Sequence, residues 1–157
     1  MTSAIDIRSA FTFSPVTQTI VGQSEPIRRL RAMIETVART RLAVLIQGPT
    51  GAGKELVAAA LHSESGRTGA FVPFNVCAIS ESMFEDALFG HVRGAFTGAH
   101  GDVPGFLREA HGGTVFLDEV SGLAPAMQAK LLRAIETGVF RPVGAKRDVH
   151  ARDGVGG

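Results

Sequence analysis

The sequence contains 157 residues, about the length of a single domain. Its 16 basic and 15 acidic residues leave a net charge of +1, which argues against binding nucleic acid or membranes through a strong overall field. A single cysteine, Cys77, excludes an internal disulfide and a multi-thiolate zinc site, and no apolar run approaches the roughly 18 residues that span a bilayer. Because the N-terminus also lacks the apolar segment of a signal peptide, we predict a cytoplasmic protein with a buried, inert thiol.

The first half of the chain predicts an arm, two helices and a strand. Residues 1–18 show no sustained period and are predicted to form an arm or linker. Ser24 is a candidate N-cap for a helix whose apolar residues recur on one face. Residues 42–46 are continuously apolar, which is typical of a buried parallel strand, and a Gly-rich turn then leads into a helix over residues 54–62.

The second half of the chain continues the alternation. Strands are predicted over residues 71–76 and 114–117. Helices are predicted after a capping box of Ser82 and Glu85, over residues 106–110, and where Met127, Leu131 and Ile135 share one face before Gly138. Strands alternating with helices at this spacing predict an α/β fold with a parallel sheet.

The first functional motif is GPTGAGKE, residues 48–55, between the first predicted strand and its helix. Its glycines let successive backbone N–H groups point into one concavity, where the helix N-terminus adds a partial positive charge and Lys54 reaches the outer phosphates of a nucleotide. Glu55 stands where this motif usually has the Ser or Thr that binds magnesium. The alternative is an ordinary glycine turn with a surface lysine, but the context favours a nucleotide site made of Gly48, Pro49, Thr50, Gly51, Ala52, Gly53, Lys54 and Glu55.

The second functional motif is VFLDE, residues 115–119. A hydrophobic strand delivers Asp118 and Glu119 at its C-terminal end, where parallel sheets bind ligands. Asp118 would hold Mg²⁺, directly or through water, and Glu119 would polarise the attacking water. An acidic pair at a strand end is otherwise a cap or a solvated edge, and the phosphate loop upstream favours the nucleotide interpretation.

The third motif is GAFTGA, residues 94–99, whose small residues predict a mobile loop rather than regular structure. Two interpretations are open from the residues alone. Phe96 could tuck into the core, as most phenylalanines do, or it could be an exposed aromatic presented to a protein partner.

These motifs, together with QAKLLRAIETGVFRPVG, occur in this order at close spacing. Over about residues 20–149 the chain resembles the central AAA+ domain of bacterial enhancer-binding proteins, which activate sigma-54 RNA polymerase. GAFTGA is the most specific of the shared motifs, and GKE is common in this family. The resemblance implies a P-loop NTPase (AAA+) three-layer fold, of which the chain holds the first three strands and their helices without the lid domain.

The resemblance also implies roles for individual residues. ATP and Mg²⁺ are the expected cofactors, with Gly48–Lys54 as Walker A and Asp118 and Glu119 as Walker B. Asn75 matches the residue that restrains the catalytic glutamate, while Val21 and Gly22 fall where the family covers the adenine. Intact relatives form homo-oligomeric rings, usually hexamers, and the expected contacts with sigma-54 RNA polymerase are Gly94, Ala95, Phe96, Thr97, Gly98 and Ala99.

The family pattern stops at Val149, after which the chain reads HARDGVGG. We therefore expect a partial AAA+ domain over residues 19–149 and an unrelated Gly-rich tail over residues 150–157, with a frameshift or a truncated gene as a hypothesis. Without the sensor strand, arginine fingers, lid and DNA-binding domain, we expect an exposed sheet edge, a tendency to aggregate and little ATP turnover. The alternative function is a non-catalytic interaction protein that binds sigma-54 or mixes into rings of intact activators, or a remnant.

Overall fold

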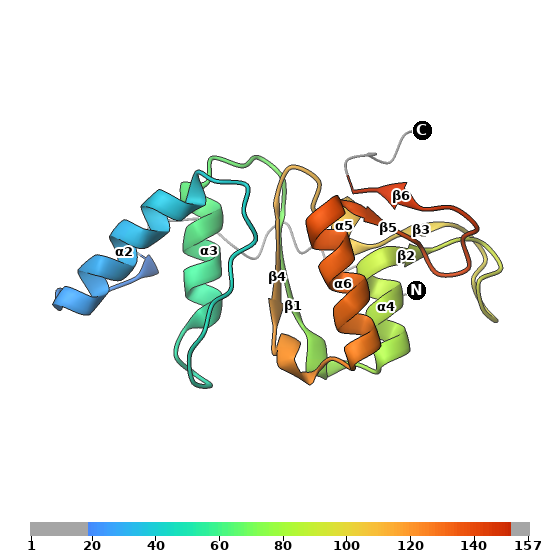
Figure 1. Cartoon of the computed structure of the whole chain (residues 1–157), viewed down its shortest axis with the longest axis horizontal. Coiled ribbons are helices and arrows are strands. Elements are labelled where there is room, and N and C mark those ends of the chain that lie inside the picture. Colours follow the sequence, from blue (N-terminus) through green and yellow to red (C-terminus); the bar gives the residue numbers. More distant parts are fainter. Residues whose placement is uncertain (1–18, 152–157) are drawn as a thin grey trace, which may run out of the picture. The chain divides into compact units, whose positions relative to one another are not determined.

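Helices and short strands alternate along residues 19–151, the part of the chain that the computed structural model describes (Figure 1). The predicted arm and residues 152–157 of the predicted tail lie outside this part. The chain divides into two compact units. The first unit holds the chain up to Val72 together with Gly112–Phe116, and the second holds Pro73–His111 and the chain from Leu117 onward.

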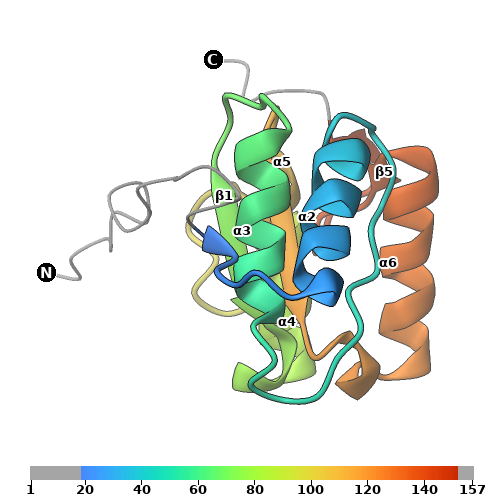
Figure 2. The ribbon, with the colours of Figure 1, turned by 90° about the vertical axis from the view of Figure 1, so that its left-hand side faces the viewer.

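In the first unit, helix α2 (Glu25–Ala38) packs beside helix α3 (Lys54–Glu64) (Figure 2). Ser24 occupies the N-cap of α2 as predicted, but its side chain accepts no capping hydrogen bond. The two helices are joined by an apolar cluster, which confirms the predicted inner face of α2. Its members are Ile20, Ile34 and Ala60, with Ile27, Leu30, Val57 and Leu61 packed against them.

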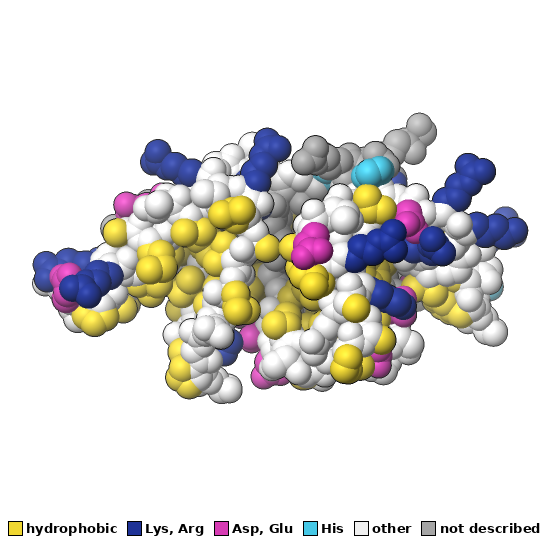
Figure 3. Space-filling view, in the orientation of Figure 1, with side chains coloured by type: hydrophobic (Ala, Val, Ile, Leu, Met, Phe, Trp, Pro, Cys, Tyr) yellow, Lys and Arg dark blue, Asp and Glu magenta, His cyan; other side chains and the backbone are white. Residues whose placement is uncertain are grey.

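The predicted strand over residues 42–46 is wrong: no residue from Arg41 to Pro49 is in a strand. The apolar side chains of this segment lie in solvent, with Leu42 and Leu45 each 73% exposed. A strand exists only where a partner completes its backbone hydrogen bonds, and no strand among residues 19–151 pairs with this segment. Apolar side chains accordingly gather on the surface over α2, α3 and the segment between them (Figure 3).

The two other predicted strands are confirmed as β1 (Phe71–Asn75) and β4 (Thr114–Asp118), which pair in parallel. The backbones approach closely where this pairing begins. A Cβ added at Gly113 would lie 2.1 Å from the carbonyl oxygen of Ala70, so only glycine fits there. Thr114 N donates to the same oxygen at 2.9 Å.

Within the first unit, His62 on α3 contacts the first residues of both strands. Its side chain is buried, and its Nδ1 lies 2.9 Å from Thr114 Oγ1 while its ring packs against Phe71. Burial lowers the pKa of His62, and the nearby Arg67 guanidinium lowers it further. The imidazole is therefore neutral at pH 7 and fills a structural position.

The second unit is built around helices α4 (Glu81–Phe89) and α6 (Pro125–Thr137), with the short helix α5 (Phe106–Glu109) beside them (Figure 1). All three helices were predicted. Their shared core is apolar. It consists of Val76, Phe84, Leu88, Phe89, Leu123, Met127, Leu131, Ala134 and Phe140.

Two details of these helices differ from the prediction. The N-cap of α4 is Ser80, whose Oγ accepts from Met83 N, so Ser82 lies inside the helix and the predicted capping box is wrong. On α6, Ala134 is buried with Met127 and Leu131, whereas Ile135 is 49% exposed. The predicted end of α6 is confirmed, because Gly138 adopts a left-handed conformation with φ 68°.

Two short hairpins and two 3-10 turns complete the second unit. Strands β2 (Gly90–His91) and β3 (Val103–Pro104) pair antiparallel, as do β5 (Val139–Phe140) and β6 (Val149–His150). The turn η2 (Val76–Ala78) directly follows β1, and the turn η3 (Val120–Gly122) follows β4 after Glu119. Among residues 19–151, no helix is both long and apolar enough to cross a bilayer.

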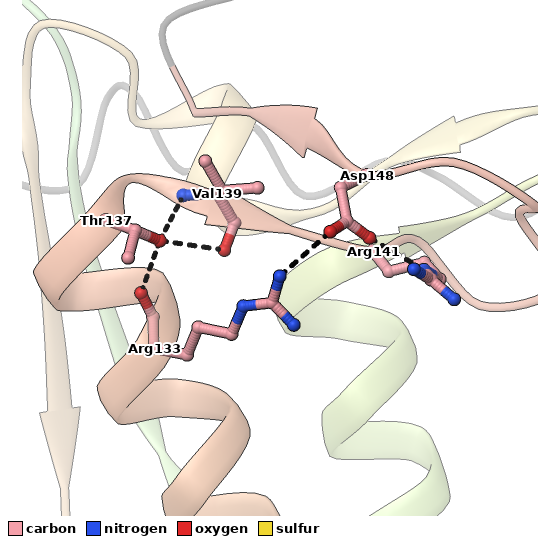
Figure 4. Close-up of polar contacts among 5 residues, drawn as sticks. All are labelled: Arg133, Thr137, Val139, Arg141 and Asp148. Atoms are coloured by element: carbon pink, nitrogen blue, oxygen red, sulfur yellow. Dashed lines mark hydrogen bonds and ion pairs between the residues drawn. The ribbon is translucent and has the colours of Figure 1, made fainter.

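Asp148 ties the β5–β6 hairpin to α6 (Figure 4). Its carboxylate accepts from Arg141 Nε at 2.7 Å and from Arg133 at 3.0 Å. The Arg141 hydrogen bond, aided by the charges of both arginines, holds the pKa of Asp148 below its usual range. At the base of the hairpin, the hydroxyl of Thr137 donates to Arg133 O and accepts from Val139 N.

The exposed segment 42–46 generates a prediction about self-association. Replacing Leu42 and Leu45 with Ser in the full chain removes two exposed apolar side chains beside unpaired backbone. We expect the double variant to shift from aggregates toward monomer in sedimentation velocity at equal protein concentration. Gln47→Ser, at the exposed residue that directly follows this segment, is the control and should behave as the parent. Equal aggregation of all three chains would contradict the prediction.

Candidate functional site

The Gly-rich loop that precedes α3 is a tight turn. Ala52 N donates to Pro49 O at 3.1 Å, and Gly51 and Gly53 have φ values of 79° and 81°. These angles lie in the left-handed region, where a side chain is strained. Space is not the reason for glycine at position 51, because a Cβ there would meet nothing within 4 Å. The loop therefore needs its glycines for backbone conformation.

The loop ends on an uncapped helix N-terminus. Gly53 is the N-cap of α3, and no side chain caps this end. The first backbone bond into the helix is from Val57 N to Gly53 O, so within the described residues the amides of Lys54, Glu55 and Leu56 have no acceptor. Free amides at a helix N-terminus favour an anion.

Lys54 lies back over its own loop. Its Nζ is 3.5 Å from Gly48 O and 3.3 Å from Pro49 O, which are long contacts for a charged donor. The Lys54 ammonium can therefore readily leave these carbonyl oxygens for a stronger acceptor. Lys54 is partly exposed, and the neighbouring Glu55 is exposed.

The acidic pair lies where the sequence predicts, at the end of β4. Asp118 is half-buried and its Oδ1 accepts from Glu119 N at 2.9 Å, while Glu119 is exposed. Glu119 has φ 59° and is the one non-glycine residue with positive φ among residues 19–151. A left-handed non-glycine residue costs on the order of 1 kcal/mol, and such strained residues cluster at active sites and ligand-binding positions.

Asn75 ends β1 as predicted, but its side chain caps the following turn. Its Oδ1 accepts from Cys77 N at 2.8 Å. The structure gives Asn75 no hydrogen bond to Glu119 among the described residues. Its predicted role as a restraint on Glu119 stays a prediction.

Cys77, which sequence reasoning placed in the core, interacts electrostatically with Glu119. The residue is exposed, which corrects the expected buried thiol. Its sulfur lies against Gly122, where an added Cβ would be 2.6 Å from Sγ. The pKa of the Cys77 thiol is raised by partial desolvation of the sulfur, by its hydrogen bond to Glu119, and by the charges of Glu119 and Asp118.

GAFTGA forms an irregular loop between β2 and β3, as predicted. Gly94 N donates to Ala99 O at 2.9 Å and Ala99 N donates to Phe96 O at 3.0 Å, so the loop is closed by its own backbone. Thr97 is exposed, and Phe96 is 47% exposed rather than buried in the core. Of the two interpretations of Phe96, the geometry matches the exposed aromatic.

Val21 and Gly22 lie just before α2. Ile20 anchors this segment by entering the apolar cluster of the first unit and by accepting from Arg31 through its carbonyl. Val21, by contrast, is 76% exposed, and Gly22 has φ 133° with Ile27 beside its α-carbon. Val21 is thus an exposed apolar side chain at the start of α2.

A glycine loop opening a helix and a strand ending in two acids define the P-loop class of nucleoside triphosphatases. The profile of the family described as the sigma-54 interaction domain matches residues 20–153. This chain belongs to that family, and its fold is an AAA+ P-loop fold.

Curated relatives and solved structures agree with this assignment. The chain is 46% identical over 135 residues to the transcriptional regulator VasH of Vibrio cholerae, covering 85% of this chain and 26% of VasH. It is 46% identical over 137 residues to the response regulator protein PilR of Pseudomonas aeruginosa, covering 87% of this chain and 31% of PilR. The crystal structure of NtrX from Brucella abortus in complex with ATP superposes with a TM-score of 0.71 at 41% identity, covering 83% of this chain and 29% of NtrX. The chain thus spans about a quarter to a third of the length of these proteins.

The contact of Cys77 with Glu119 can be tested through thiol chemistry. Glu119→Gln removes the negative charge that disfavours the thiolate, so the Cys77 pKa should fall. We expect iodoacetamide to alkylate Cys77 roughly two- to tenfold faster at pH 7.5 in this variant.

Glu136→Gln is the matched control, because Glu136 is an exposed glutamate on α6. In this variant, Cys77 should be alkylated at the parent rate. Identical rates for the parent and both variants would show that Glu119 does not act on the thiol.

Proposed function

We propose that this chain binds ATP through the loop Gly48–Lys54 and that the protein containing it uses ATP to remodel sigma-54 RNA polymerase. The observation that carries the proposal is the loop itself. Its left-handed glycines, the free amides at the start of α3 and the weakly held Lys54 together make a site for a polyphosphate. Membership of the sigma-54 interaction domain family and the ATP complex of NtrX support it.

The chain's residues fit a nucleotide in three further ways. Pro49, Thr50 and Ala52 complete the loop. Pro49 has no N–H and the Ala52 N–H is engaged by Pro49 O, so the other backbone N–H groups of the loop would bind the phosphates. Lys54 would leave its carbonyl contacts for the outer phosphates. Val21 and Gly22 would cover the adenine, as expected from the family.

The acidic pair fits the metal and the water of ATP hydrolysis. Asp118 is half-buried with one oxygen engaged by Glu119 N, which leaves the other oxygen for Mg²⁺. A bound Mg²⁺ would neutralise phosphate charge. Glu119, held in a fixed backbone conformation, would polarise the attacking water, and Asn75 would influence Glu119 through the turn that it caps.

The GAFTGA loop would provide the contact with sigma-54. Backbone hydrogen bonds within Gly94–Ala99 close the loop, and Phe96 and Thr97 are exposed at the surface. An exposed aromatic on a preformed loop is a typical anchor for a protein partner. This exposure also suits the second candidate function, a non-catalytic protein that binds sigma-54 or joins rings of intact activators.

Nucleotide binding is tested with Lys54→Ala. Loss of a charged phosphate contact costs about 1.5–3 kcal/mol, so we expect ATP affinity in isothermal titration calorimetry to fall roughly ten- to a hundredfold. Lys146→Ala, an exposed lysine in the β5–β6 hairpin, should bind as the parent.

The two candidate functions are separated by this titration together with measurements of ATP turnover and of sigma-54 binding. The proposed activity predicts that Asp118→Asn removes the Mg²⁺ dependence of ATP affinity and that Glu119→Gln retains binding. ATP binding by the parent without any turnover in assembled rings, together with binding to sigma-54, would favour the non-catalytic protein. Equal ATP affinity of the parent and Lys54→Ala would contradict the proposed nucleotide site.

The partner contact is tested with Thr97→Ala. The threonine is exposed in the loop and makes no contact needed for the fold among the described residues. We expect its loss to weaken binding of purified sigma-54 by about tenfold or more, as expected of an interface anchor, with ATP affinity unchanged. Thr68→Ala, an exposed threonine of the first unit, is the control; unchanged sigma-54 binding by Thr97→Ala would remove the loop from the interface.

A further inference from the structure

Phe96 packs against a side chain outside its own loop. Its ring meets the imidazole of His91 edge-on, with ring centroids 4.9 Å apart and an interplanar angle of 66°. This is the arrangement that aromatic rings favour, because the positive edge of one ring faces the negative face of the other. The contact leaves Phe96 47% exposed, so the ring is supported on one side and open on the other.

His91 is itself held firmly. Its Nδ1 lies 2.6 Å from Asp86 Oδ1, and only 11% of its side chain is exposed. Asp86 belongs to the last turn of α4, and its carbonyl accepts from the N–H of the C-cap residue Gly90. A largely buried ring that is hydrogen-bonded to the last turn of a helix is a rigid support.

The backbone between His91 and α4 is fixed as well. Gly90 has φ 76°, and a Cβ there would lie 2.3 Å from the carbonyl oxygen of Val103 on β3. Across the loop, Arg93 N donates to Asp102 Oδ1 at 2.7 Å. The base of the GAFTGA loop is thus held on both sides by backbone contacts, while the Phe96 ring itself packs against His91.

We propose that His91, oriented by Asp86, is a positioning residue that presents Phe96 to the partner of the loop. The ring contact favours one orientation of Phe96, with its outer face toward solvent, before any partner arrives. Preorganisation of this kind strengthens binding because less side-chain freedom is lost in the complex. The presentation step rests on the proposed function, whereas the support of the ring by His91 does not.

The support of the ring is tested by fluorescence. The chain contains neither tryptophan nor tyrosine, so Phe96→Trp introduces a single reporter. An aromatic contact of this geometry should favour the docked ring by about two- to tenfold. In the Phe96→Trp background, His91→Ala should therefore raise acrylamide quenching of the indole by about twofold or more.

Three further variants make the result specific. Asp86→Asn keeps the imidazole and weakens only its charge-assisted hydrogen bond, so quenching should be intermediate. His91→Phe restores an aromatic edge and should return quenching toward the parent value. His100→Ala, an exposed histidine of the same hairpin, should change nothing; equal quenching in the parent and His91→Ala, or an equal rise in His100→Ala, would overturn the proposal.

The presentation step is tested with Phe96 intact. His91→Ala should weaken binding of purified sigma-54 by about two- to tenfold and leave ATP affinity unchanged. Tighter binding would overturn the proposal, because it would show that His91 withholds the ring instead of presenting it. Failure of the parent chain to bind sigma-54 would count against the proposed function, while the fluorescence series would still decide whether His91 supports the ring.

Discussion

The parallel pairing of β1 with β4 is the constraint on which the acidic site depends. The carboxyl ends of paired parallel strands lie at one edge of a sheet, so the residues after Asn75 and after Asp118 are brought together. There η2 and η3 meet, with the Cys77 sulfur against Gly122. The left-handed turn at Glu119 directs the chain from β4 into η3, and thereby sets the carboxylate beside the thiol.

The sequence could predict the elements whose cause is local and not those whose cause is distant. β1 and β4 were predicted from apolar runs, and the end of α6 from Gly138, because each signal lies within the element. Residues 42–46 carry the same apolar signal but form no strand in the described part of the chain. An apolar run indicates that a segment is suited to a buried sheet, whereas a strand forms only when a neighbouring strand completes its backbone hydrogen bonds.

The errors on the helices have geometric causes. At 100° per residue, position i+7 on α6 lies about 20° from position i, and position i+8 lies about 80° away. Ala134 is therefore in line with Met127 and is buried, whereas Ile135 turns outward despite its larger apolar side chain. For α4, both Ser80 and Ser82 are residue types that can cap a helix N-terminus. The helix begins after Ser80 because of the position at which the chain leaves η2.

The same distinction applies to the functional residues. The phosphate loop and the acidic pair are contiguous motifs, and the structure places each on the predicted element, whereas the contact of Cys77 with Glu119 joins segments far apart in the sequence. Phe96 shows why composition alone left two interpretations open. The loop around it is closed by backbone bonds that any side chain at this position would allow. Within residues 19–151, the ring that packs against Phe96 is the imidazole of His91, a contact that local composition could not predict and that leaves about half of Phe96 exposed.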